Sequence, residues 1–100
     1  MNPKEFSQAI KQPGVYLLDV RPASDYDGSH IEGAHDLDVT DPDFAKKAES
    51  TLPKDETIAV YCKTGKHSAI AQQELEKLGY KVINLDNGIT SWIADNLPTT

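Results

Sequence analysis

The chain of 100 residues has one cysteine and no long hydrophobic run. The single thiol, Cys62, cannot form an internal disulfide, which favours a reducing compartment or a reactive nucleophile. The longest apolar stretches, Val15–Leu18 and Ile58–Cys62, fall far short of the roughly 20 residues that a membrane-spanning helix requires. The first residues also lack the basic segment and apolar run of a secretory signal. We therefore expect a single cytoplasmic domain covering residues 1–100, without a membrane segment.

Positive charge is scarce. Ten Lys and Arg residues against sixteen Asp and Glu residues give a formal net charge of −6, and Arg21 is the only arginine. Such a field repels phosphate backbones and anionic lipid surfaces, so nucleic acid is not an expected partner.

Three continuous apolar segments predict buried parallel strands, because a half-exposed strand would alternate apolar and polar residues. They are Val15–Val20, Thr57–Cys62 and Val82–Leu85. A fourth, weaker strand is expected over Ala34–Val39.

Helices are expected between these strands. Asn2, Pro3 and Glu5 stand in the order that starts a helix, and Gly79 supplies a left-handed stop after the segment Ser68–Leu78. Shorter helices are expected over Asp43–Ser50 and Ile89–Asn96. The alternation predicts an α/β fold: a small parallel sheet of about four to five strands with helices on both faces.

The segment Pro22–Ala45 contains seven acidic residues and no Lys or Arg. A calcium loop would need a glycine where Asp41 stands and a glutamate where Lys47 stands, so we interpret the segment as a solvated acidic face. His30 and His35 do not have zinc-ligand spacing either. No metal and no organic cofactor are expected.

The residues with the clearest chemical meaning follow the second long strand, from Cys62 to Ser68. A loop between a parallel strand and a helix lies at the usual ligand-binding edge of an α/β sheet. Its amides and the helix N-terminus favour negative charge and lower the pKa of a thiol, and Lys63 and Lys66 add positive charge. Gly65 suits a tight turn. The alternative is a buried structural cysteine at the end of an apolar strand.

Cys62-Lys63-Thr64-Gly65 resembles the active-site loop of the rhodanese family of sulfurtransferases, and the resemblance extends over nearly the whole chain. Ser29, Glu32 and Asn87 depart mildly from the family pattern. The other segments that carry the resemblance are Leu18-Asp19-Val20-Arg21, Asp25-Tyr26, His30-Ile31-Glu32-Gly33-Ala34, Leu85-Asp86-Asn87-Gly88 and Trp92.

The resemblance implies that Cys62 is a catalytic nucleophile, which takes a sulfane sulfur from a small donor such as thiosulfate. A persulfide would then pass the sulfur to cyanide, a thiol or a protein acceptor. The loop residues expected to bind substrate are Lys63, Thr64, Gly65, Lys66, His67 and Ser68. Asp19 and Arg21 are expected to support the loop as an ion pair or hydrogen-bonding frame.

His67 is the main departure, because active members of the family usually have an arginine at this position that holds the oxyanion end of the donor. A histidine offers no bidentate clamp, and its charge near neutral pH depends on its surroundings, so we expect weaker anion binding. A non-catalytic interaction module or a persulfide carrier therefore remains an alternative. A phosphatase or arsenate reductase would need an arginine where Ser68 stands.

Overall fold

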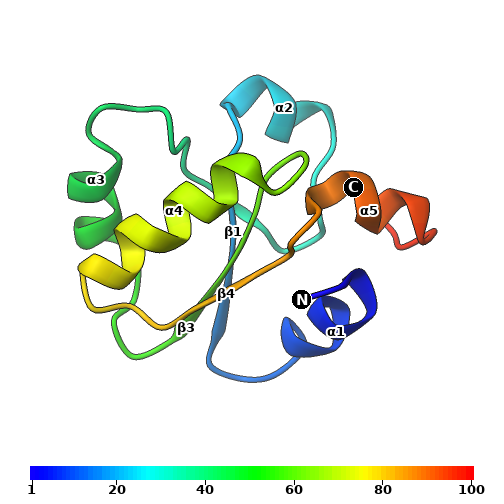
Figure 1. Cartoon of the computed structure of the whole chain (residues 1–100), viewed down its shortest axis with the longest axis horizontal. Helices are drawn as coiled ribbons and strands as arrows, with labels where there is room; N and C mark the ends of the chain where they lie inside the picture. The colour runs from blue at the N-terminus through cyan, green and yellow to red at the C-terminus, as the bar shows by residue number, and fades with distance from the viewer.

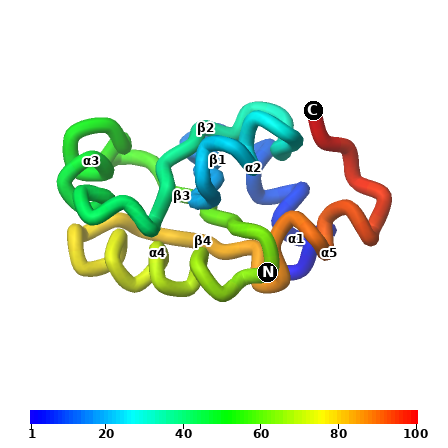
Figure 2. The backbone as a smooth tube through the Cα atoms, turned by 90° about the horizontal axis from the view of Figure 1, so that it is seen from above, coloured from blue at the N-terminus to red at the C-terminus, as the bar shows by residue number.

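Four parallel strands form the sheet of the computed structural model, which describes all 100 residues. The order across the sheet is β2-β1-β3-β4, and every neighbouring pair is parallel. The strands are β1 (Val15–Asp19), β2 (His35–Asp36), β3 (Thr57–Tyr61) and β4 (Val82–Asn84). Figure 2 shows this order from above, with β4 nearest the N-terminus and β2 on the far side. The predicted α/β fold with a small parallel sheet is confirmed.

Helices cover both faces of the sheet (Figure 1), so the molecule has two hydrophobic cores. On one face lie α3 (Phe44–Thr51) and α4 (Lys66–Lys77), and on the other α1 (Pro3–Ala9) and α5 (Gly88–Ala94). Successive side chains of a strand point to opposite faces. In β3, Ile58 and Val60 therefore join the core under α3 and α4, while Ala59 and Tyr61 join the other.

The N-terminal helix begins as the sequence predicts. The Asn2 side chain accepts a hydrogen bond from the Glu5 amide at 2.8 Å, and the Glu5 carboxylate accepts one from the Asn2 amide at 3.0 Å. These reciprocal bonds satisfy two amides that the helix itself cannot pair. Phe6, on the inner face of α1, is fully buried against the edge of the Trp92 ring.

One expectation from the sequence was wrong in detail, and one helix was not expected. The strand expected over Ala34–Val39 is only the two-residue β2, because the regular register ends there: the Leu37 amide donates to the Asp19 carbonyl, but the Val39 amide donates to that of Val20, one residue on instead of two. A short helix, α2 (Ala23–Gly28), was not expected, since none of its residues is buried and it has no apolar stripe to detect. Other predicted boundaries differ from the observed ones by two residues or fewer; α4, for example, begins at Lys66.

The carboxyl ends of the strands meet at the upper edge of the molecule in Figure 1, where α2 and the loop between β3 and α4 lie. None of the helices has the length and apolar character needed to cross a membrane.

Candidate active site

Cys62 directly follows β3, and its side chain packs in the core under α4. Only 2% of the residue is exposed. Its sulfur accepts hydrogen bonds from two backbone amides of the loop, Gly65 at 3.0 Å and Ser68 at 3.3 Å. The Ser68 amide belongs to the first turn of α4, where amides have no partner within the helix. The loop therefore curls around the sulfur and places donors on it.

These donors determine the acidity of the thiol. Burial by itself would raise the pKa of Cys62, but the polar groups of Ser68 and the backbone amides of Gly65 and Thr64 outweigh it. The pKa of Cys62 is therefore lowered, since hydrogen bonds to the charged form of a group favour that form. From the sequence, we expected Lys63 and Lys66 to contribute to the lowered pKa of the thiol. Both lysines are exposed, and the hydrogen bonds rather than the lysine charges produce the shift.

Gly65 makes the curl of the loop sterically feasible. Its φ of 101° lies in the left-handed region, and a Cβ atom there would overlap the carbonyl oxygen of Asp86. Gly88, with φ of 67°, is packed as tightly: a Cβ would lie 2.6 Å from the Cys62 carbonyl oxygen and still closer to that of Lys63. The two glycines let the segment before α5 lie directly against the loop.

The start of α5 fixes the backbone of the loop. The Ile89 amide donates to the carbonyl oxygen of Cys62 at 2.8 Å, and the Thr90 amide donates to that of Lys63 at 3.1 Å. First-turn helix amides thus satisfy the carbonyls on the outer side of the loop, which leaves the loop amides turned toward the sulfur. Sequence reasoning missed this role, because Ile89 and Thr90 carry no chemical signature; only the neighbouring Gly88 hinted at close packing.

Asp19 and Arg21 form a buried ion pair at the end of β1. The Arg21 Nη2 and Asp19 Oδ2 atoms are 2.7 Å apart, and the Arg21 Nε atom donates to both carboxylate oxygens at 3.0 Å. Nη2 also donates to the carbonyl oxygen of Ser29, and the guanidinium lies 5.8 Å from the centre of the Tyr61 ring. The only arginine of the chain is therefore committed to the framework beside Cys62 and is not free to bind a substrate anion.

The six predicted binding residues have different environments. Lys63, Thr64, Lys66 and His67 are exposed around the loop, and Gly65 is half-buried. Ser68 is fully buried, and its hydroxyl donates to the Gly65 carbonyl at 3.2 Å, so it lies beneath the loop rather than on its binding surface.

The amides of Lys66 and His67 have no partner within the protein. They are the donors available to an anion held above the sulfur.

Both histidines of the segment 22–45 stack on tyrosine rings, and some of its acidic residues accept hydrogen bonds from nearby groups, whereas Asp36 has a buried carboxylate oxygen without a partner. His30 stacks on Tyr26 with ring centres 3.9 Å apart, and His35 stacks on Tyr16 at 4.3 Å. Asp38 accepts from the Thr40 amide at 2.8 Å. No group of three or more His, Cys, Asp or Glu residues is placed to hold a metal ion.

The cavities of the molecule lie away from Cys62. The largest, about 580 Å³, opens between α1 and the start of β1. None of the three cavities is lined by a residue of the loop from Cys62 to Ser68.

The chain matches the rhodanese-like domain family over residues 2–95, and it therefore belongs to this family. It is 33% identical to an uncharacterised Synechocystis protein over 97% of the chain and 53% of that protein, so it spans about half the length of this relative. It is 33% identical to the thiosulfate sulfurtransferase GlpE of Pseudomonas fluorescens over 90% of the chain and 81% of the relative.

A solved structure shows the same fold. The chain superimposes on a rhodanese-related protein from Thermoplasma volcanium with a TM-score of 0.87 and 26% sequence identity, covering 100% of this chain and 95% of that one. The match agrees with the four-stranded parallel sheet described above.

Proposed function

We propose that this protein is a sulfurtransferase in which Cys62 takes a sulfane sulfur from a small anionic donor, such as thiosulfate, and holds it as a persulfide. The observation that carries the proposal is the pair of amide hydrogen bonds on the Cys62 sulfur, from Gly65 and Ser68. A structural cysteine needs no such donors, whereas a nucleophilic thiolate is stabilised by them. The name of the GlpE relative, a thiosulfate sulfurtransferase, supports the same activity.

The transfer has two steps that balance without an oxidant or reductant. The Cys62 thiolate attacks the outer sulfur of thiosulfate, the S–S bond of the donor breaks, and its electron pair leaves with sulfite. An acceptor thiolate or cyanide then attacks the outer sulfur of the persulfide and restores the Cys62 thiolate. Because the chain has no second cysteine, the acceptor comes from outside it.

Each part of the loop has a role in this scheme. The amides of Gly65 and Ser68 hold the inner sulfur, and the unpaired amides of Lys66 and His67 stabilise negative charge on the outer sulfur. The exposed lysines and His67 attract the oxyanion end of the donor. Because none of them provides the fork of an arginine, we expect the donor to bind weakly and KM to be high.

The test is intact-protein mass spectrometry after incubation with thiosulfate. We expect the mass of one additional sulfur atom, and we expect cyanide to remove it. The matched control is Cys62→Ser, which keeps a side chain of similar size and should show no added sulfur while retaining the wild-type circular dichroism. A wild-type protein that gains no sulfur, or a serine variant that gains it, would overturn the proposal.

A further inference from the structure

Two exposed isoleucines stand beside the catalytic loop. The chain has only three large hydrophobic side chains that are exposed: Ile93 at 51%, Ile70 at 46% and Met1 at 37%. Single exposed apolar residues are common and need no explanation, but a group of them around one site marks an interaction surface. The location of the two isoleucines relative to the loop is therefore informative.

Ile70 lies on α4 one helical turn after Lys66, so the two side chains share one face of the helix. Ile93 lies on α5 three residues after Thr90, whose amide is bonded to the Lys63 carbonyl. Ile70 therefore lies next to an exposed cation on α4, and Ile93 lies on the helix whose first turn is bonded to the backbone of Lys63.

The exposed residues of the loop differ in charge from the rest of the molecule. Lys63, Lys66 and His67 are exposed there, in a chain of net charge −6. Of the neighbouring acids, Asp86 is paired with the N-terminal ammonium group at 2.8 Å. The acidic helix α2 lies across the sheet from the start of α4, in the upper half of Figure 2. At physiological salt, charges are screened over about 8 Å, so a partner at the loop feels mainly the lysines.

We propose that Lys63, Lys66, Ile70 and Ile93 form a docking rim for a protein sulfur acceptor whose reactive cysteine lies in an exposed segment rich in acidic and apolar residues. This inference rests on the sulfurtransferase function proposed above and names the acceptor side of that reaction. Glutamates and aspartates of the segment pair with the two lysines, and its apolar residues cover the two isoleucines. Repulsion from α2 keeps the acidic segment on the α4–α5 side of the loop.

The docked segment presents its cysteine thiolate above Cys62. That thiolate attacks the outer sulfur of the persulfide, the S–S bond to Cys62 breaks, and its electron pair returns to the Cys62 sulfur. The acceptor leaves with the persulfide. Because these side chains contact the acceptor away from the Cys62 sulfur, docking raises the effective concentration of the acceptor without altering the chemistry of the thiol.

The test compares short synthetic acceptor peptides that have the same cysteine and leucines, with glutamate, serine or lysine at the remaining positions. The protein is first loaded with sulfur, and loss of that sulfur in a single turnover is followed by mass spectrometry. We expect the glutamate peptide to react fastest and its advantage to shrink at high salt. Cyanide, which needs no docking, serves as the reference acceptor.

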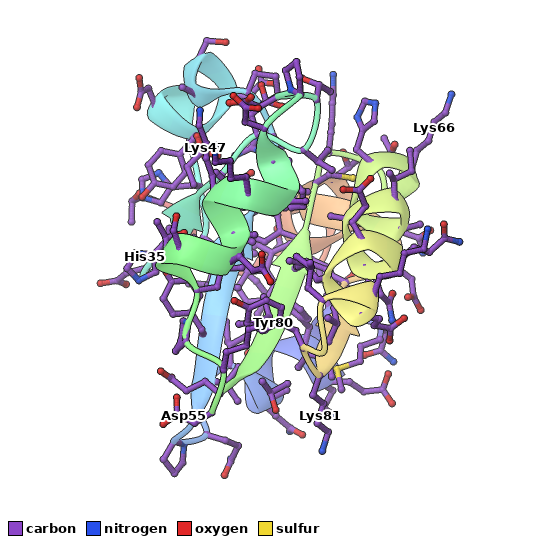
Figure 3. All side chains as sticks on the ribbon, turned by 90° about the vertical axis from the view of Figure 1, so that its left-hand side faces the viewer. His35, Lys47, Asp55, Lys66, Tyr80 and Lys81 are labelled. Atoms are coloured by element: carbon purple, nitrogen blue, oxygen red, sulfur yellow. The ribbon has the colours of Figure 1, made fainter.

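Variants of the protein locate the docking surface. Ile70→Ser and Ile93→Ser should each slow transfer to the glutamate peptide about fivefold, from the loss of half-exposed apolar contact, and leave transfer to cyanide unchanged. Lys66→Glu should slow transfer to the glutamate peptide about tenfold or more. Lys81→Glu makes the same change in net charge at the opposite end of the molecule (Figure 3) and should leave transfer to this peptide unaffected.

Direct binding separates this inference from the sulfurtransferase proposal. A labelled glutamate peptide with serine in place of its cysteine should bind the unloaded protein, and more weakly after Ile70→Ser or Ile93→Ser, whether or not sulfur is ever loaded. Equal binding of the three peptides, or no effect of the isoleucine substitutions, would overturn the docking rim. Failure of sulfur loading alone would overturn only the transfer function.

Discussion

Replacing Asp36 with asparagine should stabilise the protein at neutral pH. Asp36 ends β2 directly opposite Asp19 on β1, and its Oδ1 atom is buried without a hydrogen-bond partner. Burial, followed by the nearby charges of Asp19 and Asp38, raises the pKa of Asp36 from an ordinary 3.8 to about 6, although Arg21 acts in the opposite direction. The ionised carboxylate is therefore a destabilising group in the folded state.

The sign of the pH dependence follows from this pKa. Between pH 4 and about 6 the folded state holds a proton on Asp36 that the unfolded chain has lost, so this group makes the free energy of unfolding fall as pH rises through that interval. Each tenfold change in proton affinity corresponds to about 1.4 kcal/mol. The contribution of Asp36 to the change in the free energy of unfolding is therefore at most about 3 kcal/mol. Because Asp36 is only half-buried, solvent screening reduces this, and we expect about 1–2 kcal/mol.

Urea denaturation of the wild type and Asp36→Asn at pH 4 and pH 7.5 measures the effect. Because asparagine has nearly the same shape without the charge, the variant should be more stable at pH 7.5, with the difference shrinking toward pH 4. Asp55→Asn, at an exposed position just before β3 and at the opposite end of the sheet from Asp36, is the matched control and should change little (Figure 3). A variant that is less stable than the wild type at pH 7.5 would show that the Asp36 carboxylate makes a favourable interaction, and would refute the reasoning.

Further predictions concern the loop. Ser68→Ala removes the hydroxyl that helps to lower the pKa of Cys62, so the midpoint of thiol alkylation against pH should move upward; an unchanged midpoint would assign the effect to the amides alone. His67→Arg adds a guanidinium at the exposed rim and should raise kcat/KM for thiosulfate about ten- to a hundredfold, mainly through KM, in steady-state assays. No gain would mean that His67 does not stand in the place of an anion clamp.

The central strands were predictable because their residues are apolar on both faces. Thr57–Cys62 can only be a strand with helices on either side of it, and the loop after such a strand is the usual place for a ligand. The helix α2 and the length of β2 were not predictable. Neither has an apolar pattern of its own: α2 has no buried residue, and the end of β2 depends on how its backbone meets that of β1.

The candidate site was predictable only in its nucleophile and its turn. Cys62 and Gly65 carry chemical and conformational signals of their own. The amides of Ile89 and Thr90, which hold the outer carbonyls of the loop, are backbone groups that any residue would supply. Their contribution depends on where α5 lies in space, which the residues of the loop do not encode.

The bonds from Ile89 and Thr90 also make the acidity of the thiol depend on a distant part of the chain. They hold the backbone of the loop in the curl that places its amides on the sulfur, and an ordinary thiol without such donors is less acidic. The lowered pKa of Cys62 therefore depends on a helix outside the loop, so substitutions that loosen the contact of α5 with the loop should raise the pKa of the thiol without touching any residue near the sulfur.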